Sequence, residues 1–153
     1  MGIGTMRTEV FRNEFLQVIV PDKWKAFLGI DAEGHATPKK LHIFKNAASE
    51  MDIFHKAGIT ICYYEDAGQY LLIKDFYDDV KDISPFELGN YCWSGYTCRS
   101  FGYPYIMLET SEQTDRVLVM ILTENGENKI SFSDSDVQEI IKSIVVRRRE
   151  EKQ

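Results

Sequence analysis

Short runs of apolar, aromatic and β-branched residues recur along the chain, separated by residues that favour turns. Such runs are typical of strands, because these side chains pack well on a pleated, half-buried surface. The runs over 91–100, 105–110 and 116–123 follow one another closely, which predicts an antiparallel meander. The full set of predicted strands covers residues 14–20, 25–31, 41–45, 59–65, 70–73, 91–100, 105–110, 116–123 and 130–132.

Turn-forming residues mark the connections between these runs. Pro21-Asp22-Lys23 closes the first strand, and Trp24 follows it as an aromatic anchor. Gly and Pro residues predict a loop over 32–40, and the Gly-bearing segment 124–127 predicts a turn. The segment before residue 14 is a polar arm.

Two internal segments carry helical periodicity. Residues 47–56 are good helix formers, and Gly58 offers a stop. Residues 75–83 place Phe76, Val80 and Ile83 at helical spacing, which predicts one apolar stripe. Pro85 is expected to end this second helix, because a residue before proline disfavours the α region.

The most clearly marked element is an amphipathic helix near the end of the chain. Ser135 and Gln138 fit a capping box, in which two side chains satisfy free amide donors of the first turn. The basic run 147–149 is expected near the negative end of the helix dipole. The apolar stripe consists of Val137, Ile140, Ile141, Ile144 and Val145.

Together these elements predict an α+β protein built on a central, mainly antiparallel sheet flanked by helices. The sequence shows no internal repeat and no linker, so we expect one domain over residues 1–153, with mobile ends at 1–12 and 148–153. A length of 153 residues suits a single hydrophobic core.

Composition excludes several classes of partner. The net charge of -6, without a basic cluster, disfavours nucleic acid, since binding a phosphate backbone requires a basic footprint. No apolar run approaches the length of a membrane span. Three cysteines and no leader favour a reducing, cytoplasmic environment, although a leader removed from a precursor would leave no trace here.

The strand that ends in Pro21-x-x-Trp24 resembles the start of PsbP/Mog1-like domains. The end of the chain is similar to the strand and capped helix that close such domains, through Gly126, Ile130, Asp134, Asp136, Val137, Ile140, Ser143 and Ile144. The resemblance implies an α/β/α sandwich with a central antiparallel sheet. It implies no particular function, because such proteins range from photosystem subunits to a GTPase-binding import factor, and neither binding site is matched here. Many bacterial members are exported lipoproteins, whereas this chain shows no lipobox.

The most unusual stretch, residues 91–105, is rich in aromatic side chains. Aromatic rings are effective binding anchors, because a large rigid face loses little entropy on binding. The alternative is that these rings alternate into the sheet core, with a bulge at Gly95. The candidate binding residues are Tyr91, Trp93, Tyr96, Tyr103 and Tyr105.

The cysteines and histidines show no catalytic or metal-binding spacing. Cys92 and Cys98 lie about 20 Å apart on a continuous strand, beyond disulfide reach. The three histidines and Cys62 lack the paired spacings of zinc sites, so we expect no metal and no cofactor. An alternative is a small-molecule or enzymatic site assembled by the fold around His42, His55 and Cys62.

The remaining charged pattern is acidic. Asp75, Asp78, Asp79 and Asp82 line one face of the predicted helix, and with Glu65 and Asp66 they could hold a cation. A calcium loop needs a Gly-bearing turn with alternating oxygens, so a solvated face is the simpler interpretation. Gly2-Ile3-Gly4 precedes any strand and lacks the context of a phosphate loop.

The sequence therefore favours a non-enzymatic module that binds a protein partner or a second copy of itself. This hypothesis depends on aromatic richness and on the lack of a catalytic constellation. A concave pocket with convergent polar groups would favour the enzymatic alternative, and a flat apolar patch would favour the binding module.

Overall fold

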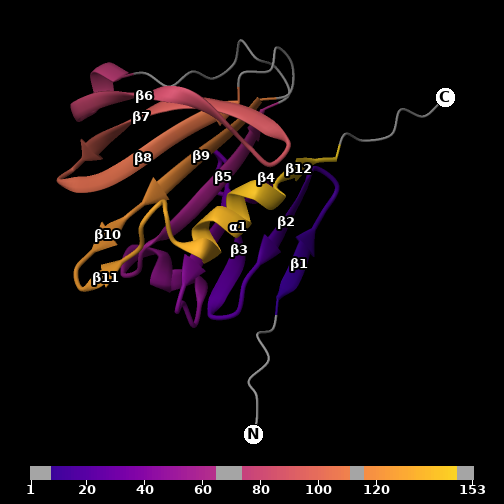
Figure 1. Cartoon of the computed structure of the whole chain (residues 1–153). Helices are drawn as coiled ribbons and strands as arrows, with labels where there is room; N and C mark the ends of the chain where they lie inside the picture. Colours follow the sequence, from indigo (N-terminus) through magenta and orange to yellow (C-terminus); the bar gives the residue numbers. More distant parts are fainter. Residues whose placement is uncertain (1–7, 65–73, 111–115, 148–153) are drawn as a thin grey trace, which may run out of the picture.

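The computed structural model describes residues 8–64, 74–110 and 116–147. Its largest element is a seven-stranded sheet in the order β3-β4-β5-β9-β8-β7-β6, with every neighbouring pair antiparallel (Figure 1). We call it the large sheet. Its strands are β3 (Trp24–Ile30), β4 (Ala36–Lys45), β5 (Gly58–Tyr64), β6 (Asp78–Leu88), β7 (Tyr91–Ser100), β8 (Tyr103–Thr110) and β9 (Arg116–Leu122).

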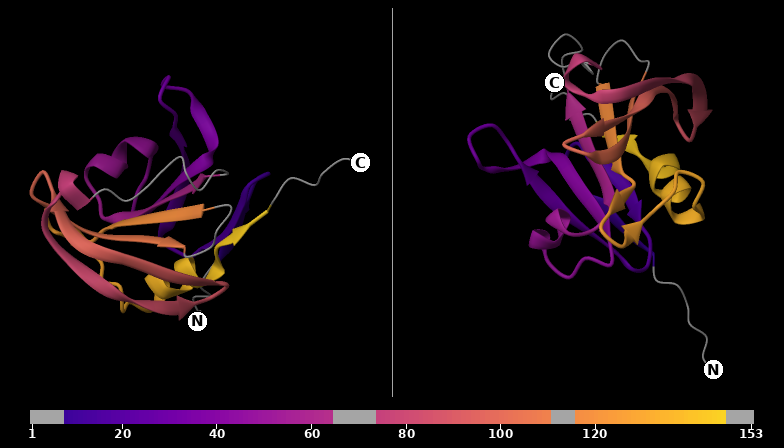
Figure 2. Two further views of the ribbon diagram at one scale, coloured as in Figure 1. Left: turned by 90° about the horizontal axis from the view of Figure 1, so that it is seen from above. Right: turned by 90° about the vertical axis from the view of Figure 1, so that its left-hand side faces the viewer.

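A second layer lies against one face of the large sheet. It contains a three-stranded antiparallel sheet, which we call the small sheet, in the order β1-β2-β12. Its strands are β1 (Glu9–Arg12), β2 (Leu16–Val20) and β12 (Val145–Val146). The helix α1 (Ser135–Ser143) lies beside the small sheet. The large sheet is strongly curved, as Figure 2 shows. Among the described residues, the other elements are the hairpin β10 (Glu124–Asn125) and β11 (Asn128–Lys129) and the 3-10 turns η1 (Glu50–Phe54) and η2 (Lys74–Phe76).

The main core lies between these two layers. Helix α1 contributes Val137, Ile140 and Ile141, and β2 contributes alternate residues along its length. Each fully buried aliphatic side chain contributes about 1.5–3 kcal/mol. The large sheet contributes Leu41, Ile43, Ile59, Ile61, Trp93, Leu108, Val117, Val119 and Ile121. We call this side of the large sheet the helix face and the other side the opposite face.

The turn between β6 and β7 secures the C-terminal end of α1. The side-chain amide of Asn90 donates to the Ile144 carbonyl at 3.2 Å, and the Tyr91 hydroxyl accepts from the backbone amide of Val146 at 3.1 Å. Gly89 has a φ of 69°, and a Cβ placed on it would lie 2.3 Å from the Lys142 carbonyl oxygen. Only glycine fits both the backbone conformation and this close approach.

The strands predicted over 14–20, 25–31, 59–65 and the 91–123 meander are confirmed as β2, β3, β5 and β7-β8-β9. The terminal amphipathic helix is confirmed over Ser135–Ser143. The strand predicted over 70–73 lies outside the described residues. Residues 130–132 form no strand, because the short pairing there ends at Lys129.

The helix predicted over 75–83 is wrong, because Asp78–Leu88 forms the edge strand β6. Two irregularities interrupt its pairing with β7, at residues 78–81 and 83–86. They break the two-residue alternation of a regular strand, so that Val80 and Ile83 take a helix-like spacing. Phe76 precedes the strand, in η2, and is exposed. Pro85 is accommodated because β6 is an edge strand. The acidic residues therefore do not line a helix face.

Other boundaries also differ from the prediction. The loop predicted over 32–40 is shorter, since β4 already begins at Ala36, and the helix predicted over 47–56 is reduced to η1. Part of the expected mobile arm pairs as β1 with β2. Among the described residues α1 is the only α-helix, so the sandwich with helices on both faces is not what the structure shows.

The ends of α1 also differ from the prediction. Asp134 is the N-cap residue and makes no side-chain cap bond, and Gln138 donates to the Phe132 carbonyl at 2.6 Å, so no capping box forms. The chain leaves the helix after Ser143 and enters β12, which places Arg147 beyond that strand. Arg147 donates instead to carbonyl groups of the 13–15 segment.

We predict that Gly89→Ala destabilises the protein more than Gly102→Ala. Both glycines have positive φ, but nothing lies within 4 Å of a Cβ on Gly102. The control should lose about 1–2 kcal/mol from the backbone conformation alone, and Gly89→Ala should lose at least about 1 kcal/mol more. Urea unfolding measures both. Equal losses would contradict the close packing of this turn against α1.

Candidate functional site

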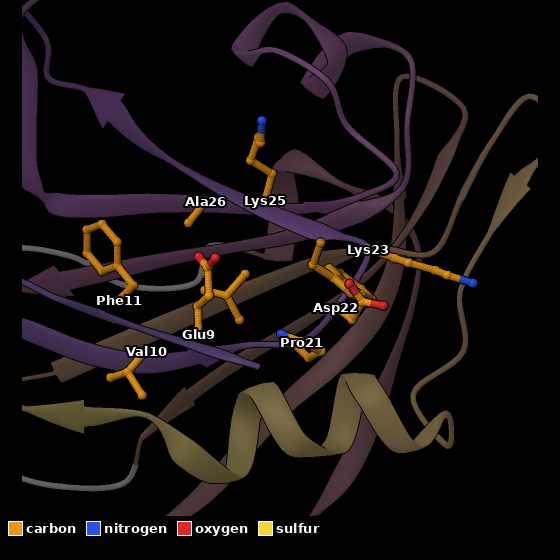
Figure 3. A pocket seen from close by; sticks show the side chains of 10 residues that line it. Glu9, Val10, Phe11, Pro21, Asp22, Lys23, Lys25 and Ala26 are labelled. Atoms are coloured by element: carbon orange, nitrogen blue, oxygen red, sulfur yellow. The ribbon is translucent and has the colours of Figure 1, made fainter. Parts of the chain in front are cut away.

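A groove of about 420 Å3 lies between strand β1 of the small sheet and strand β3 of the large sheet (Figure 3). Glu9 and Phe11 point from β1 toward Ala26 on β3, whereas Val10 points away. Val20 and the turn at Pro21-Asp22-Lys23 complete the lining at one end. The groove therefore separates the edge strands of two different sheets.

The turn between β2 and β3 keeps the two sheets apart at this point. Lys23 has a φ of 77°, and its carbonyl accepts from the Asn46 amide at 2.6 Å. The next residue, Trp24, is buried and donates its indole N–H to Asp136 at 2.9 Å. Asp136 also forms a salt bridge with Lys45 at 3.5 Å. These contacts direct the chain into the large sheet, so β3 leaves β2 without pairing with it.

The backbone of β3 has a free hydrogen-bonding side. In an antiparallel pair, alternate residues exchange bonds with the partner, and the residues between them point outward. The bond from Asn46 to Lys23 fixes which residues face β4, since Lys25 pairs with Phe44 and Phe27 with His42 in the same register. The N–H and C=O groups of Ala26 and Leu28 therefore point toward solvent and the groove. Outside the sheet ladders, no backbone bond between described residues engages them.

The opposite edge of the large sheet is different. Strand β6 carries Pro85 and the charged residues Asp78, Asp79, Lys81, Asp82 and Glu87, and its pairing with β7 is interrupted twice. Proline, charge and bulges are the devices by which edge strands avoid pairing with other chains. On β3 the only charged residue is Lys25, and Leu28 and Ile30 are 40% and 57% exposed. Strand β3 is therefore the accessible edge.

The five aromatic residues predicted as a binding surface are divided between the two faces of the large sheet. Tyr91 and Trp93 belong to the helix face, and Trp93 is fully buried with its indole N–H bonded to the Leu88 carbonyl. Tyr96 is 1% exposed on the opposite face. Tyr105 is half-buried and Tyr103 is 45% exposed. The structure does not unite the five rings on one surface, and their role in binding stays a prediction.

The residues of the enzymatic alternative are only partly brought together. His42 and Cys62 lie on adjacent strands of the opposite face, where His42 pairs with Thr60 and Cys62 with Lys40. His42 Nδ1 lies 2.8 Å from the Thr60 hydroxyl. His55 is exposed at the end of η1, before β5 begins, and so lies away from the other two. Neither histidine has a hydrogen bond to Cys62 among the described contacts.

The described cysteines are free thiols. Burial raises the pKa of Cys62, and the nearby Lys40 charge and a hydrogen bond from Tyr64 only partly oppose this effect. Burial also raises the pKa of Cys98. Because the thiolate is the reactive form, these two thiols have the properties of core side chains rather than of nucleophiles.

Of the expected acidic residues, Glu65 and Asp66 lie outside the described residues, as does the segment Gly2-Ile3-Gly4. Asp82 forms a salt bridge with Lys74 at 2.6 Å on the exposed edge of the large sheet.

The residues that line the groove between β1 and β3 were not recognised as a site from the sequence. One feature of the sequence was relevant, because residues 24–30 carry far less charge than residues 78–88. The sequence does not show that both segments are edge strands, since this depends on which distant segments pair.

The fold is PsbP-like. The solution structure of cyanobacterial PsbP (CyanoP) from Synechocystis sp. PCC 6803 matches with a TM-score of 0.51 over 95% of this chain and 94% of that chain, at 10% sequence identity. At this identity the similarity concerns the fold alone. The sequence matches no protein-family model, and a comparison with curated proteins finds no match. In the described part of the chain, no helix is long and apolar enough to cross a membrane.

The half-buried His42 predicts a pH dependence of stability. Burial lowers the pKa of His42 to about 4 from an ordinary value of 6.5, and the Lys40 charge adds to the effect. Between these values the unfolded chain binds a proton that the folded chain does not. The free energy of unfolding therefore falls as the pH is lowered from 6.5 toward 4.

We expect His42→Gln to remove part of this pH dependence. Between pH 7 and 4.5 the variant should lose about 1 kcal/mol less unfolding free energy than the wild type, a figure reduced for solvent screening of a half-buried group. Urea unfolding at four pH values measures this difference, with the exposed His55→Gln as control. Parallel pH profiles for His42→Gln and the wild type would contradict it.

Proposed function

We propose that this protein is a non-enzymatic interaction module that binds an extended segment of a partner protein along strand β3. The segment adds to the large sheet as a further strand, so that its backbone bonds to Ala26 and Leu28. This mode of binding takes affinity from main-chain hydrogen bonds and specificity from alternate side chains. The observation that carries the proposal is the open edge of β3, in contrast with the protected edge of β6.

The groove supports the same proposal through its lining. Phe11, Val20 and Ala26 offer apolar contacts to alternate side chains of an incoming strand. Glu9 and Asp22 contribute carboxylates, and Lys23 and Lys25 contribute ammonium groups. An extended segment with a small apolar side chain facing the groove and polar residues on either side fits this lining.

The enzymatic alternative has less support. His42 and Cys62 share a face of the sheet, but the pKa of His42 is lowered and that of Cys62 is raised, so both groups stay neutral near pH 7. Activation of a thiol by a histidine requires an ion pair or a hydrogen bond between them.

The net charge of -6 favours a protein over a nucleic acid as the binding partner.

Amide hydrogen exchange tests the free edge in the protein alone. The amides of Ala26 and Leu28 should exchange much faster than those of Lys25 and Phe27, because only the latter pair is bonded to β4. Nuclear magnetic resonance measures each amide separately. Equal protection of all four amides would show that the edge is already occupied, for example by a second copy of the chain.

Binding is tested with peptides selected from a random library on the immobilised protein. Ala26→Pro removes an outward N–H without removing a bond to β4, and Leu28→Lys places a charge on the edge. Each variant should weaken the selected peptides about 10-fold or more, as expected for the loss of about 1.4 kcal/mol. Phe101→Lys, at a side chain that is 96% exposed on the β7–β8 turn, is the matched control.

The outcomes separate the hypotheses. If Phe101→Lys loses binding and the β3 variants do not, the binding site lies on the hairpin of β7 and β8 instead. Sedimentation velocity on the wild type and on Leu28→Lys identifies self-association, since a dimer abolished by Leu28→Lys would make a second copy the natural occupant. Failure to select any peptide against a monomeric protein would contradict the proposal.

A further inference from the structure

The hairpin between β3 and β4 brings together three side chains that can ligate a metal ion. They are Asp31, Glu33 and His35, each exposed, and one ligand atom from each lies within 4.8 Å of the other two. Alternate residues of the turn between the two strands supply the three groups. The sequence analysis paired histidines and cysteines with one another and did not consider this spacing of carboxylate, carboxylate and imidazole.

The turn holds the backbone of this trio in place. The Asp31 amide donates to the His35 carbonyl at 2.8 Å, and the Gly34 amide donates to the Asp31 carbonyl at 3.0 Å. Asp31 Oδ1 accepts from the amides of Glu33 at 2.9 Å and His35 at 3.0 Å. These bonds use one oxygen of Asp31 and fix its carboxyl group, so the other oxygen stays available for a cation.

The other two ligands are also available. Among the described residues, no hydrogen bond or salt bridge engages the carboxylate of Glu33 or the imidazole ring of His35. In a tetrahedral site with bonds of about 2.1 Å, neighbouring ligand atoms lie about 3.4 Å apart. The proposed site therefore requires the exposed side chains to close from the present spacing of up to 4.8 Å.

The mixture of donors distinguishes this trio from an ordinary acidic patch. Calcium and magnesium take oxygen ligands almost entirely, whereas an imidazole nitrogen beside carboxylate oxygens suits zinc and its first-row neighbours. Three protein ligands leave at least one coordination position open. A cavity of about 560 Å3, lined in part by Asp31, Glu33, Lys39 and Lys40, lies alongside the two carboxylates.

We propose that Asp31, Glu33 and His35 form a binding site for one divalent transition-metal ion, of which Zn²⁺ is the representative. None of the three residues lines the groove between β1 and β3, so this proposal does not depend on the proposed function. The imidazole binds in its neutral form, and both carboxylates bind ionised.

Calorimetric titration of the full chain with ZnCl2 at pH 7.5 tests the site. The wild type should bind one equivalent saturably, and His35→Ala and Glu33→Gln should each weaken binding about 10-fold or more. His55→Ala removes another exposed histidine outside the trio and should leave the titration unchanged. All the substituted side chains are exposed, so the variants are expected to fold, and their unfolding curves verify this.

Parallel titrations with CaCl2 and MgCl2 examine the role of the imidazole. Both ions should bind much more weakly than Zn²⁺, and His35→Ala should not alter that weak binding. Three results would overturn the proposal: no saturable Zn²⁺ binding up to millimolar concentrations, equal losses in His35→Ala and His55→Ala, or equal affinity for Ca²⁺ and Zn²⁺. The nuclear magnetic resonance signals of the His35 ring give an independent readout, since they should shift with the first equivalent of Zn²⁺.

Discussion

The need to cover one face of the large sheet determines much of this structure. A seven-stranded sheet exposes apolar side chains on both faces, and here one α-helix and a three-stranded sheet together cover the helix face. Helix α1 has nine residues, too short to be stable alone, so its position depends on packing and on its contacts with the β6–β7 turn. Gly89 and Tyr91 therefore couple the far edge of the large sheet to the end of the helix. The aromatic residue Tyr91 acts here in assembly of the fold.

The way in which α1 and the small sheet cover the helix face also explains why β3 has no neighbouring strand on one side. The chain passes from the small sheet to the large sheet at Trp24, and the hydrogen bond from Trp24 to Asp136 ties this corner to the first turn of α1. Strand β2 is then occupied on both sides, by β1 and β12. Strand β2 therefore has no free side for β3, β1 pairs only with β2 among the described strands, and a groove remains between β1 and β3. An accessible sheet edge is a hazard in a monomer unless it is protected or used, and this contrast with β6 is what suggests use.

Local patterns predicted the elements whose environment is regular. The stripe of Val137, Ile140 and Ile141 marked α1, and the alternation in β7, β8 and β9 marked the meander. The prediction failed at β6, because two irregularities interrupt the alternation of apolar and polar side chains there. In the sequence Pro85 indicates the end of a helix, although it lies within this edge strand. The groove between β1 and β3 could not be predicted, because it depends on which distant strands pair. The burial of Trp93 and Tyr96 has the same origin, since aromatic content alone does not distinguish a core from a surface.

The pairing irregularity in β3 limits how much of the edge a partner can use. Leu28 pairs with Leu41 but Gly29 pairs with Thr37, so three residues of β4 have no counterpart on β3. The extra residues make a bulge on β4, beside the Leu28–Gly29 step of β3. The side chain of Lys40 lies against Gly29, within 3.0 Å of where a Cβ would be. A bulge of this kind increases local twist and interrupts a flat edge. The Trp24 amide already donates to the Pro21 carbonyl at 3.1 Å, so an added strand has the outward groups of Ala26 and Leu28 to pair with before it reaches the register shift. This short free stretch favours a short docking segment over continuous sheet growth between copies.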